Sequence, residues 1–410
     1  MKKILSLLLI AVILVSATGC DFSIFSEETV LDPAEINENF SISKLNIYPE
    51  SKKFQLIGKF ERSGYNQLND TQKGIYILMD NAVFNMQTGY ISLGKATQMD
   101  ISIACLALRN DRPEYFWLPT AYALRTKGVL GEICFAKTDK DWLYTEAERQ
   151  QFEKKILDAL TQINQNFSGE ETEFARELLA HDTLVTKLEY DSKNVNNYKN
   201  NPSSWDIVGA FCNGKTVCEG YAKAMQVLAF MLGINCATVT GVSTEPHMWN
   251  VINIENNWYH LDPTANDTDN SSYHFFFNVT TEYLLKSYTI DPVFKPVSQN
   301  ETVDSGNIFL PTCTATEYNY HIVNSLYIAD KSQIESTVVS MLCAARRSGK
   351  RMVEFAVSPE MDFVFGSADT AKIFKIERCV SIANSELGSK RIKKYSYGGI
   401  TGALGFMISW

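Results

Sequence analysis

Cys218 combines a nucleophilic side chain with a position that would activate it. The apolar residues that follow it recur at helical spacing as far as Leu232, and Gly233 comes next as a stop signal. Cys218 therefore falls in the first turn of a predicted buried helix. The N–H groups and the positive end of the helix dipole at that point favour a thiolate over a thiol. The sequence predicts a reactive nucleophile at Cys218.

A base and an acid follow on a predicted β-hairpin. His247 lies on its first strand, and Asp262 lies near the end of its second. If residues 255–256 form a two-residue loop, Asp262 lies opposite Trp249, and His247 is its diagonal neighbour, within reach of an imidazole and a carboxylate. If residues 256–257 form the loop instead, the two side chains move apart. The sequence permits contact between His247 and Asp262, and the position of the loop decides whether this contact forms.

These three side chains supply the parts of covalent catalysis at a carbonyl carbon. Cys218 would attack the carbonyl, and His247 would take the thiol proton and later return a proton to the leaving group. Asp262 would hold the imidazole in the required tautomer and orientation. Backbone N–H groups at the helix start, including that of Cys218, are natural donors to the oxyanion. We expect a cysteine-nucleophile hydrolase or acyltransferase.

The segments around these residues resemble the three core motifs of the bacterial transglutaminase-like family, within the papain-like superfamily of cysteine enzymes. They read VCEGYA at 217–222, HMWNV at 247–251 and WYHLDPT at 258–264. Upstream, HDTLV at 181–185, followed by YD at 190–191, is similar to the helix before the core, and DRPEYFW at 111–117 is similar to segments of exported members. The resemblance implies that Cys218, His247 and Asp262 are nucleophile, base and orienting acid. It also implies an α+β fold with a papain-like transglutaminase core, in which the nucleophile helix packs on an antiparallel sheet.

The first 20 residues have the pattern of an export signal. Lys2 and Lys3 precede an apolar run over residues 4–15, and small residues lead into Cys20. This ending resembles the lipobox of bacterial lipoproteins, which implies cleavage before Cys20 and attachment of lipid to its thiol. A simple secretory signal with an incidental Cys20 is the alternative. No later segment reaches the ~18 uninterrupted apolar residues of a spanning helix, so we expect a lipid anchor on the extracytoplasmic face of the cell membrane.

The chain is long enough for several domains. At about 150 residues per domain, 410 residues suggest two or three. Helical periodicity begins near Asp70, a strand is expected over 129–135, and capping boxes at 145–148 and 168–171 predict helices to about residues 166 and 189. The final part alternates strands and helices. Strands are expected over 321–328, 351–357, 393–397 and 406–410, and helices from a capping box at 332–335 and over 371–382.

These patterns define a predicted domain organisation. It comprises a lipoprotein signal peptide (1–19), a tether and irregular segment (20–69), a mostly helical N-terminal accessory region (70–165), the transglutaminase-like catalytic core (166–295) and a small α/β C-terminal accessory domain (310–410).

Charge and cysteine pattern argue against several classes of function. Lys and Arg total 38 against 47 Asp and Glu, so the net charge is −9 and a nucleic-acid partner is not expected. The eight cysteines after Cys20 show no Cys-x-x-Cys, and no His pair has ligand spacing, which argues against zinc. No EF-hand-like loop suggests calcium. We expect no metal, no cofactor and few or no disulfides; a regulatory disulfide between Cys212 and Cys218 stays open.

Four aromatic residues lie close to the motifs. Trp205, Tyr221, Trp249 and Tyr259 could line a substrate groove, or they could pack the core around the helix. His260 has no role in the motifs and is interpreted as structural.

Two hypotheses of different class follow for the function. The first is a lipid-anchored enzyme that cleaves or exchanges amide bonds of a peptide or protein substrate through a Cys218 thioester. Hydrolysis is favoured over amine transfer, because water is always present whereas an amine acceptor needs its own binding site. The second is a catalytically inactive transglutaminase-like surface module that binds a protein or a cell-wall partner. A substrate-binding lipoprotein for uptake fits poorly, because a single core lies between dissimilar flanks. The sequence does not indicate the oligomeric state.

Overall fold

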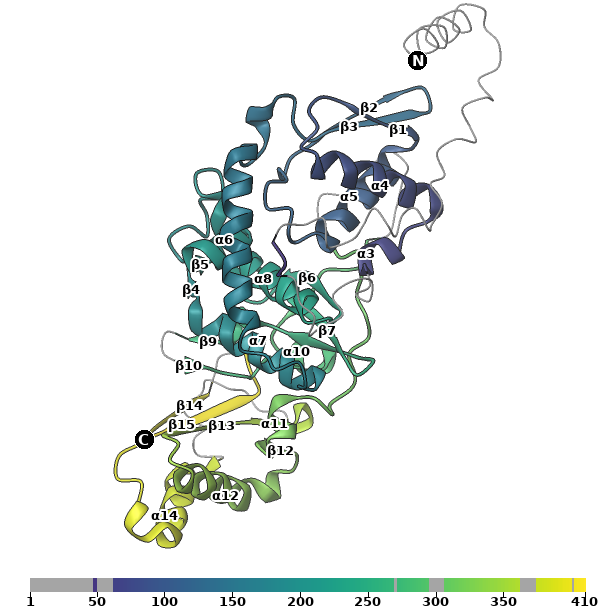
Figure 1. Cartoon of the computed structure of the whole chain (residues 1–410). Helices are drawn as coiled ribbons and strands as arrows, with labels where there is room; N and C mark the ends of the chain where they lie inside the picture. The colour runs from purple at the N-terminus through teal and green to yellow at the C-terminus, as the bar shows by residue number, and fades with distance from the viewer. Residues whose placement is uncertain (1–46, 50–61, 269–270, 295–305, 362–373, 400–401) are drawn as a thin grey trace, which may run out of the picture. The chain divides into compact units, whose positions relative to one another are not determined.

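The computed structural model describes residues 47–49, 62–268, 271–294, 306–361, 374–399 and 402–410 (Figure 1). The predicted signal peptide (1–19), Cys20 and much of the predicted tether lie outside these residues. All described residues belong to one compact unit that extends from Ser41 to Trp410, and the predicted domain boundaries stay predictions. No helix in the described part of the chain combines the length and the apolar character needed to cross a membrane.

Capped helices and a small sheet make up the N-terminal accessory region. Its helices are α4 (Asp70–Phe84) and α5 (Gln98–Asp111). The short helix α3 (Ser63–Asn66) lies in the segment predicted as irregular, 20–69, and packs against α5. Its strands β1 (Ile91–Lys95), β2 (Ala123–Lys127) and β3 (Leu130–Cys134) form an antiparallel sheet in the order β1-β3-β2. Both long helices begin at a capping box, at residues 69 and 72 and at residues 97 and 100. The helix predicted from Asp70 and the strand predicted over 129–135 are confirmed.

A buried charge cluster anchors the 111–117 segment. Arg112 donates to Asp80 through Nε at 2.7 Å and through Nη2 at 3.1 Å, and to Glu114 through Nη1 at 3.1 Å. Tyr115 donates its hydroxyl to Asp80 at 3.0 Å. All four side chains are buried, so removal of one partner would leave an uncompensated charge in the interior. These contacts tie the 111–117 segment to α4 through Asp80.

Two helices lead from this region into the predicted core. α6 (Glu146–Asn164) begins at the capping box predicted at 145–148. α7 (Glu173–Lys187) begins later than predicted, because the box at 168–171 forms only an isolated turn. Gly169 in that turn has a φ of +95°, which an α-helix does not accommodate. Thr172 caps α7 instead.

The core is a buried helix on an antiparallel sheet (Figure 1). α8 (Cys218–Met231) packs against β6 (Cys236–Val242) and β7 (Pro246–Ile254). With β8 (Asn257–Leu261) and β11 (Thr289–Ile290), these strands form a four-stranded sheet in the order β11-β6-β7-β8. α8 ends where Gly233 adopts a φ of +72°, the stop that the sequence predicts. The predicted α+β fold, with a buried helix that starts at Cys218 and packs on an antiparallel sheet, is confirmed.

The β7–β8 hairpin has the register that brings His247 toward Asp262. Ile254 pairs with Asn257, which leaves residues 255–256 as a two-residue loop. Both loop residues have positive φ, 50° and 68°, as in a type I′ turn, whose twist matches that of the strands. The alternative loop at 256–257 is therefore wrong.

Short elements complete the core. They are β4 (Glu189–Tyr190), η4 (Pro202–Trp205), η5 (Gly209–Asn213), β5 (Lys215–Thr216), α9 (Pro263–Asn266), β9 (Asp267–Thr268), β10 (Ser271–Ser272) and α10 (Thr281–Leu284), whereas η3 (Asp139–Asp141) belongs to the N-terminal accessory region before α6. β4 pairs with β5 in parallel, and β9 pairs with β10 in the antiparallel sense.

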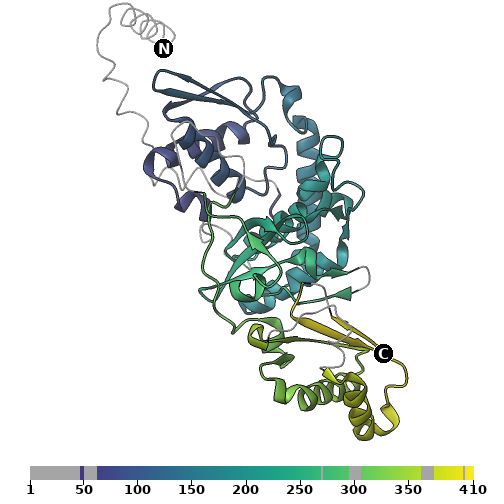
Figure 2. The ribbon, with the colours of Figure 1, turned by 180° about the vertical axis from the view of Figure 1, so that it is seen from behind.

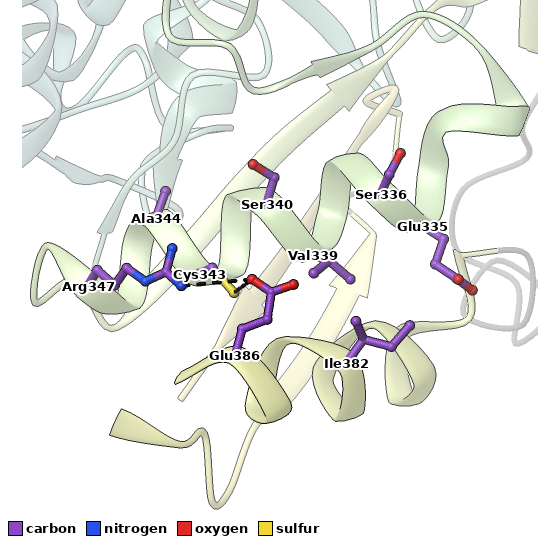
Figure 3. A pocket seen from close by; sticks show the side chains of 9 residues that line it. All are labelled: Glu335, Ser336, Val339, Ser340, Cys343, Ala344, Arg347, Ile382 and Glu386. Atoms are coloured by element: carbon purple, nitrogen blue, oxygen red, sulfur yellow. Dashed lines mark hydrogen bonds and ion pairs between the residues drawn. The ribbon is translucent and has the colours of Figure 1, made fainter. Parts of the chain in front are cut away.

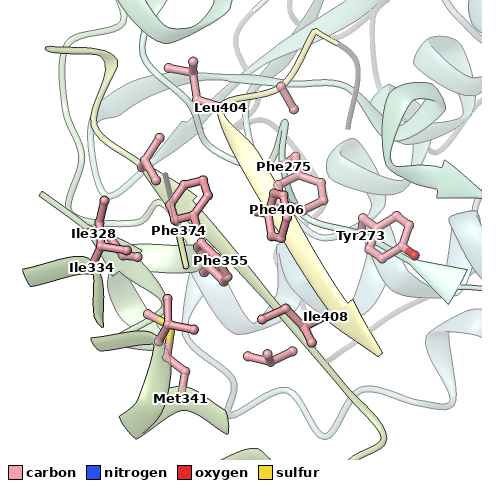
Figure 4. Packing of buried hydrophobic residues seen from close by; sticks show 14 of the residues in the cluster. Tyr273, Phe275, Ile328, Ile334, Met341, Phe355, Phe374, Leu404, Phe406 and Ile408 are labelled. Carbon is pink, nitrogen blue, oxygen red and sulfur yellow. The ribbon is translucent and has the colours of Figure 1, made fainter. Parts of the chain in front are cut away.

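A four-stranded sheet and two helices form the C-terminal accessory domain (Figure 2). Its strands β12 (Tyr327–Ile328), β13 (Met352–Val357), β14 (Ser396–Gly399) and β15 (Gly405–Ser409) have the order β12-β13-β15-β14. α12 (Ile334–Arg347) and α14 (Ile376–Leu387) pack together on one side of this sheet. Phe355 and Phe406 lie in its hydrophobic core, and Phe275 of the preceding part of the chain packs against β15 (Figure 4). A Cβ on Gly405 would lie 1.9 Å from the Phe275 ring, so only glycine permits this contact.

Three local predictions in this domain need correction. The strand predicted over 321–328 is wrong: the Asn319 side chain accepts hydrogen bonds from the next N–H groups and starts α11 (Tyr320–Val323), so only β12 is extended. The box predicted at 332–335 does not cap α12, because the turn η6 (Lys331–Gln333) precedes it. α14 lies further along the chain than the helix predicted over 371–382, of which residues 371–373 lie outside the described ones. The remaining predicted strands correspond to β13, β14 and β15, and the turns η7 (Pro359–Met361) and η8 (Gly388–Lys390) complete the domain.

Candidate active site

The three residues predicted to carry the chemistry come together from three elements. Cys218 is the first residue of α8, His247 lies at the start of β7, and Asp262 follows β8 as the N-cap of α9. His247 Nε2 lies 2.7 Å from Asp262 Oδ2. The same imidazole is hydrogen-bonded to the Cys218 thiol, and because Nε2 faces Asp262, Nδ1 is the nitrogen left for the sulfur. The catalytic roles stay predictions, but the contacts form a continuous Cys–His–Asp chain.

Asp262 is a buried carboxylate that accepts three hydrogen bonds. Besides His247, the Tyr288 hydroxyl donates to Oδ2 at 2.7 Å, and the backbone N–H of Ala265 donates to Oδ1 at 3.1 Å. The residue is only 1% exposed. Burial opposes the charged form, but the His247 ring and the hydrogen bonds outweigh it and lower the pKa of Asp262. The group therefore stays ionised beside the imidazole at neutral pH.

The Asp262 carboxylate changes the pKa of His247. Burial by itself would lower the pKa of the ring, but the charge of Asp262 and the hydrogen bonds to Asp262 and Cys218 raise the pKa of His247 to about 10. The ring is thus protonated at neutral pH. An imidazolium next to a cysteine stabilises the thiolate, and it can later deliver a proton to a leaving group.

The start of α8 is built to hold negative charge. The N-cap residue of α8, Val217, makes no side-chain hydrogen bond to the first-turn N–H groups. Thr216 packs closely beneath this turn and donates Oγ1 to the carbonyl oxygen of Ser204 at 2.8 Å. A Cβ on Gly220 would lie 1.7 Å from that hydroxyl oxygen, so the close approach requires glycine. Uncapped N–H groups at a helix start favour a thiolate or an oxyanion at Cys218.

The four aromatic residues proposed as substrate contacts differ in exposure. Tyr221, Trp249 and Tyr259 are fully buried, and Trp205 is partly exposed. The Trp249 ring stacks on His247 with centroids 6.0 Å apart, and the two tyrosine hydroxyls are hydrogen-bonded to carboxylates. Core packing, the alternative interpretation, accounts for these three rings, because they present no surface to a substrate. A substrate contact at Trp205 stays a prediction.

His260 has the structural role expected from the sequence. His260 is fully buried, accepts from Trp249 Nε1 at 3.1 Å through Nδ1, and contacts Thr281 Oγ1 through Nε2 at 3.1 Å. Burial lowers the pKa of His260 to about 4, so the ring is neutral and structural. Cys212 and Cys218 are both free thiols, and no disulfide joins them in this structure.

Two tyrosines beside the Cys218–His247–Asp262 contacts are not predicted from the sequence as site residues. Tyr288 donates to Asp262, and its ring meets Trp249 edge-on at 5.3 Å. Tyr190 is 42% exposed and stacks on Tyr221 with centroids 6.5 Å apart. Burial, together with the nearby Cys218 and Asp262, raises the pKa of Tyr190, which places this ring next to the site. Tyr190 belongs to a segment that the sequence singles out, but no pattern points to Tyr288.

A second cluster of ionisable groups includes three possible metal ligands. Among the described residues, His181, Asp182 and His274 bring ligand atoms within 4.8 Å of one another. Phe276 N donates to Asn266 Oδ1 at 3.0 Å, which turns Asn266 Nδ2 toward His181 Nε2, also at 3.0 Å. His181 Nε2 is therefore the acceptor, and Nδ1 carries the proton that faces Asp182 at 2.9 Å.

His274 is a donor on both sides of its ring. Nε2 lies 2.9 Å from Asp182 Oδ1, and Nδ1 lies 2.7 Å from Glu354 Oε1 on β13. Burial lowers the pKa of His274, but the hydrogen bonds to the two carboxylates outweigh it and raise the pKa to about 9. Both imidazoles thus point N–H groups at Asp182, and no ring lone pair faces the centre. With these protons in place, the cluster is an ion-pair network that links the core to the C-terminal domain.

A groove of about 410 Å³ runs between α12 and α14 (Figure 3). Its lining comprises Glu335, Ser336, Val339, Ser340, Cys343, Ala344, Arg347, Ile382 and Glu386. The Cys343 thiol donates to Glu386 Oε2 at 3.6 Å, and burial and that carboxylate raise the pKa of Cys343. The thiol is held protonated, so this groove offers no second nucleophile.

One family model matches the core segment of this chain. Residues 161–263 match the family model of the transglutaminase-like superfamily, and this part of the chain belongs to that superfamily. A crystal structure of a TGase is similar over 37% of this chain and 46% of its own length, at 16% identity and a TM-score of 0.27. A crystal structure of a candidate cysteine protease from Cytophaga hutchinsonii is similar over 42% and 65%, at 14% identity and a TM-score of 0.24. The chain thus spans less than two thirds of either protein. A search of curated proteins found no match.

Proposed function

We propose that this chain is a lipid-anchored extracytoplasmic cysteine enzyme that acts on amide bonds of peptides or proteins. The carrying observation is the hydrogen-bonded chain from Cys218 through His247 to Asp262, at the uncapped start of a buried helix. Membership of residues 161–263 in the transglutaminase-like superfamily supports a cysteine-type enzyme.

The geometry supports a two-step reaction through a thioester. The Cys218 thiolate attacks the carbonyl carbon, and the first-turn N–H groups of α8 stabilise the oxyanion. His247 then gives its proton to the leaving nitrogen, the C–N bond breaks, and an acyl thioester with Cys218 remains. A water molecule attacks next, His247 takes its proton, and the C–S bond breaks to release a carboxylic acid. Asp262 keeps its charge and holds the ring in place throughout.

Hydrolysis is our preferred second step, and an amine-competition experiment tests it. The full chain is incubated with a defined mixture of glutamine-containing peptides, with and without a biotinylated primary amine, and the products are identified by mass spectrometry. Carboxylic acids should dominate in both reactions and should disappear with Cys218→Ala. Predominance of amine-linked products would overturn the preference for water alone. Absence of any product that depends on Cys218, with the fold intact, would overturn the enzyme and favour a binding module.

The anchor is a separate part of the proposal and rests on the pattern that ends at Cys20. We expect the mature chain to begin at Cys20, to carry a diacylglycerol thioether there, and to partition with membranes. Cys20→Ala should release it into the soluble fraction. A mature chain that is soluble and unmodified at Cys20 would refute the anchor and leave the chemistry untouched.

A further inference from the structure

The Asp262 carboxylate is shared between two side-chain donors. His247 Nε2 and the Tyr288 hydroxyl both lie 2.7 Å from the same oxygen, Oδ2. Tyr288 is 6% exposed, and burial and the charge of Asp262 raise the pKa of its hydroxyl. The hydroxyl therefore keeps its proton at neutral pH and serves as a donor to Asp262. Tyr288 lies outside residues 161–263, the segment that matches the family model.

The surroundings of Tyr288 leave its ring little freedom. It meets His247 at 65° and 5.9 Å, Trp249 at 81° and 5.3 Å, and Phe276 at 51° and 5.1 Å. Its backbone N–H donates to Leu284 O at 3.0 Å, and the next residue starts β11, which pairs with β6. A ring held on three sides aims its hydroxyl at one place, the oxygen that faces His247.

We propose that Tyr288 is a positioning residue of this site, whose hydroxyl orients the Asp262 carboxylate toward His247 and shares its negative charge. This inference rests on the proposed function. A hydrogen bond to an ionised carboxylate favours the charged form, so Tyr288 keeps Asp262 ionised to lower pH. It thereby extends the range in which His247 stays charged and aligned beside Cys218.

The pH dependence of Cys218 alkylation tests this role without knowledge of the substrate. The informative part is the acid limb, the low-pH side of the profile on which labelling slows. Iodoacetamide labelling of Cys218 in the full chain is followed against pH by peptide mapping, for the wild type and for Tyr288→Phe. We expect the acid limb to move up by about one pH unit in Tyr288→Phe, so that labelling on that limb is about tenfold slower. The variant keeps the ring and its packing, and a thermal melt verifies its fold.

Two comparisons separate positioning from general loss of a buried hydroxyl. Tyr283 is also buried, and its hydroxyl accepts from Leu404 N at 3.0 Å; Tyr283→Phe should leave the acid limb where it is. In an Asp262→Asn background, Tyr288→Phe should cause no further shift, because its target has no charge.

The outcomes distinguish this inference from the proposed function. An acid limb that is the same in the wild type and in Tyr288→Phe, both well below the range of an ordinary thiol, overturns the role of Tyr288 and leaves the enzyme standing. Equal shifts in Tyr288→Phe and Tyr283→Phe also overturn it, since loss of any buried hydroxyl would then suffice. Wild-type labelling only in the range of an ordinary thiol overturns both.

Discussion

Asp262→Asn should lower the pH at which His247 loses its charge. The substitution keeps the size of the side chain and removes the negative charge that lies 2.7 Å from Nε2. In the wild type, the ring's pKa stands at about 10 against an ordinary 6.5. That difference corresponds to about 5 kcal/mol in favour of the charged ring. Because burial lowers the pKa of His247 and only the contacts with Cys218 would remain to raise it, the amide variant should titrate well below pH 10.

NMR titration of the imidazole C–H signals measures this directly. The chain has 5 histidines, and the His247 signal is assigned by its absence from His247→Gln. Asp182→Asn is the matched control, since it removes another histidine-bonded carboxylate; it should lower the titration of His274 and leave that of His247 unchanged. If His247 titrates at the same pH in Asp262→Asn as in the wild type, the electrostatic reasoning for the site is refuted.

Three further predictions concern packing, a turn and the domain contact. Gly220→Ala should destabilise the chain by about 1–3 kcal/mol in chemical denaturation and slow Cys218 labelling, because the added methyl group collides with Thr216; unchanged stability would contradict this. Glu255→Asn should raise the free energy of unfolding by up to about 1 kcal/mol, because position 255 has a φ of 50° that asparagine tolerates better; a loss of stability would count against it. His274 has its pKa raised to about 9 from 6.5, so its contribution, about 3 kcal/mol, is fully present below pH 6.5 and is lost as pH rises through 9. His274→Gln should therefore be less stable than the wild type at pH 6, with a difference that shrinks by pH 10; a gap that is the same at both pH values would oppose the ion-pair network.

The chain Cys218–His247–Asp262 could be predicted from sequence because its signals are local. A helix start with small residues identifies Cys218, and a short hairpin carries the other two residues. The sequence does not decide the register of the hairpin, since two loop positions are compatible with the residues. The structure selects the 255–256 loop, whose two positive φ values satisfy the twist of the hairpin.

Tyr288 and the His181–His274 network could not be predicted because long-range packing creates them. Tyr288 reaches Asp262 only because β11 joins the edge of the core sheet. His181 and His274 have no spacing that suggests a pair, and they meet across α7 and the segment after β10. Aromatic residues near a motif likewise do not reveal their exposure, which is why Trp249 and Tyr259 suggested a groove and proved to be core residues.

Errors in the C-terminal domain have a different cause, the competition between side chains and backbone pattern. The alternation in 321–328 favours a strand, but the Asn319 side chain accepts two backbone hydrogen bonds and starts a helical turn. A cap of this kind can be predicted from sequence only where the residues after it also have a helical pattern, and residues 321–328 do not.

The most direct test of the central claim is site-resolved labelling of the cysteines with iodoacetamide at mildly acidic pH. An imidazolium beside Cys218 and an uncapped helix start predict that Cys218 reacts first, well below the pH at which ordinary thiols react, and that His247→Ala removes this advantage. The buried Cys236 and Cys379, whose pKa values burial raises, should stay unlabelled in the folded chain. Labelling of Cys218 only in the alkaline range of ordinary thiols, or equally fast labelling with and without His247, would contradict the account.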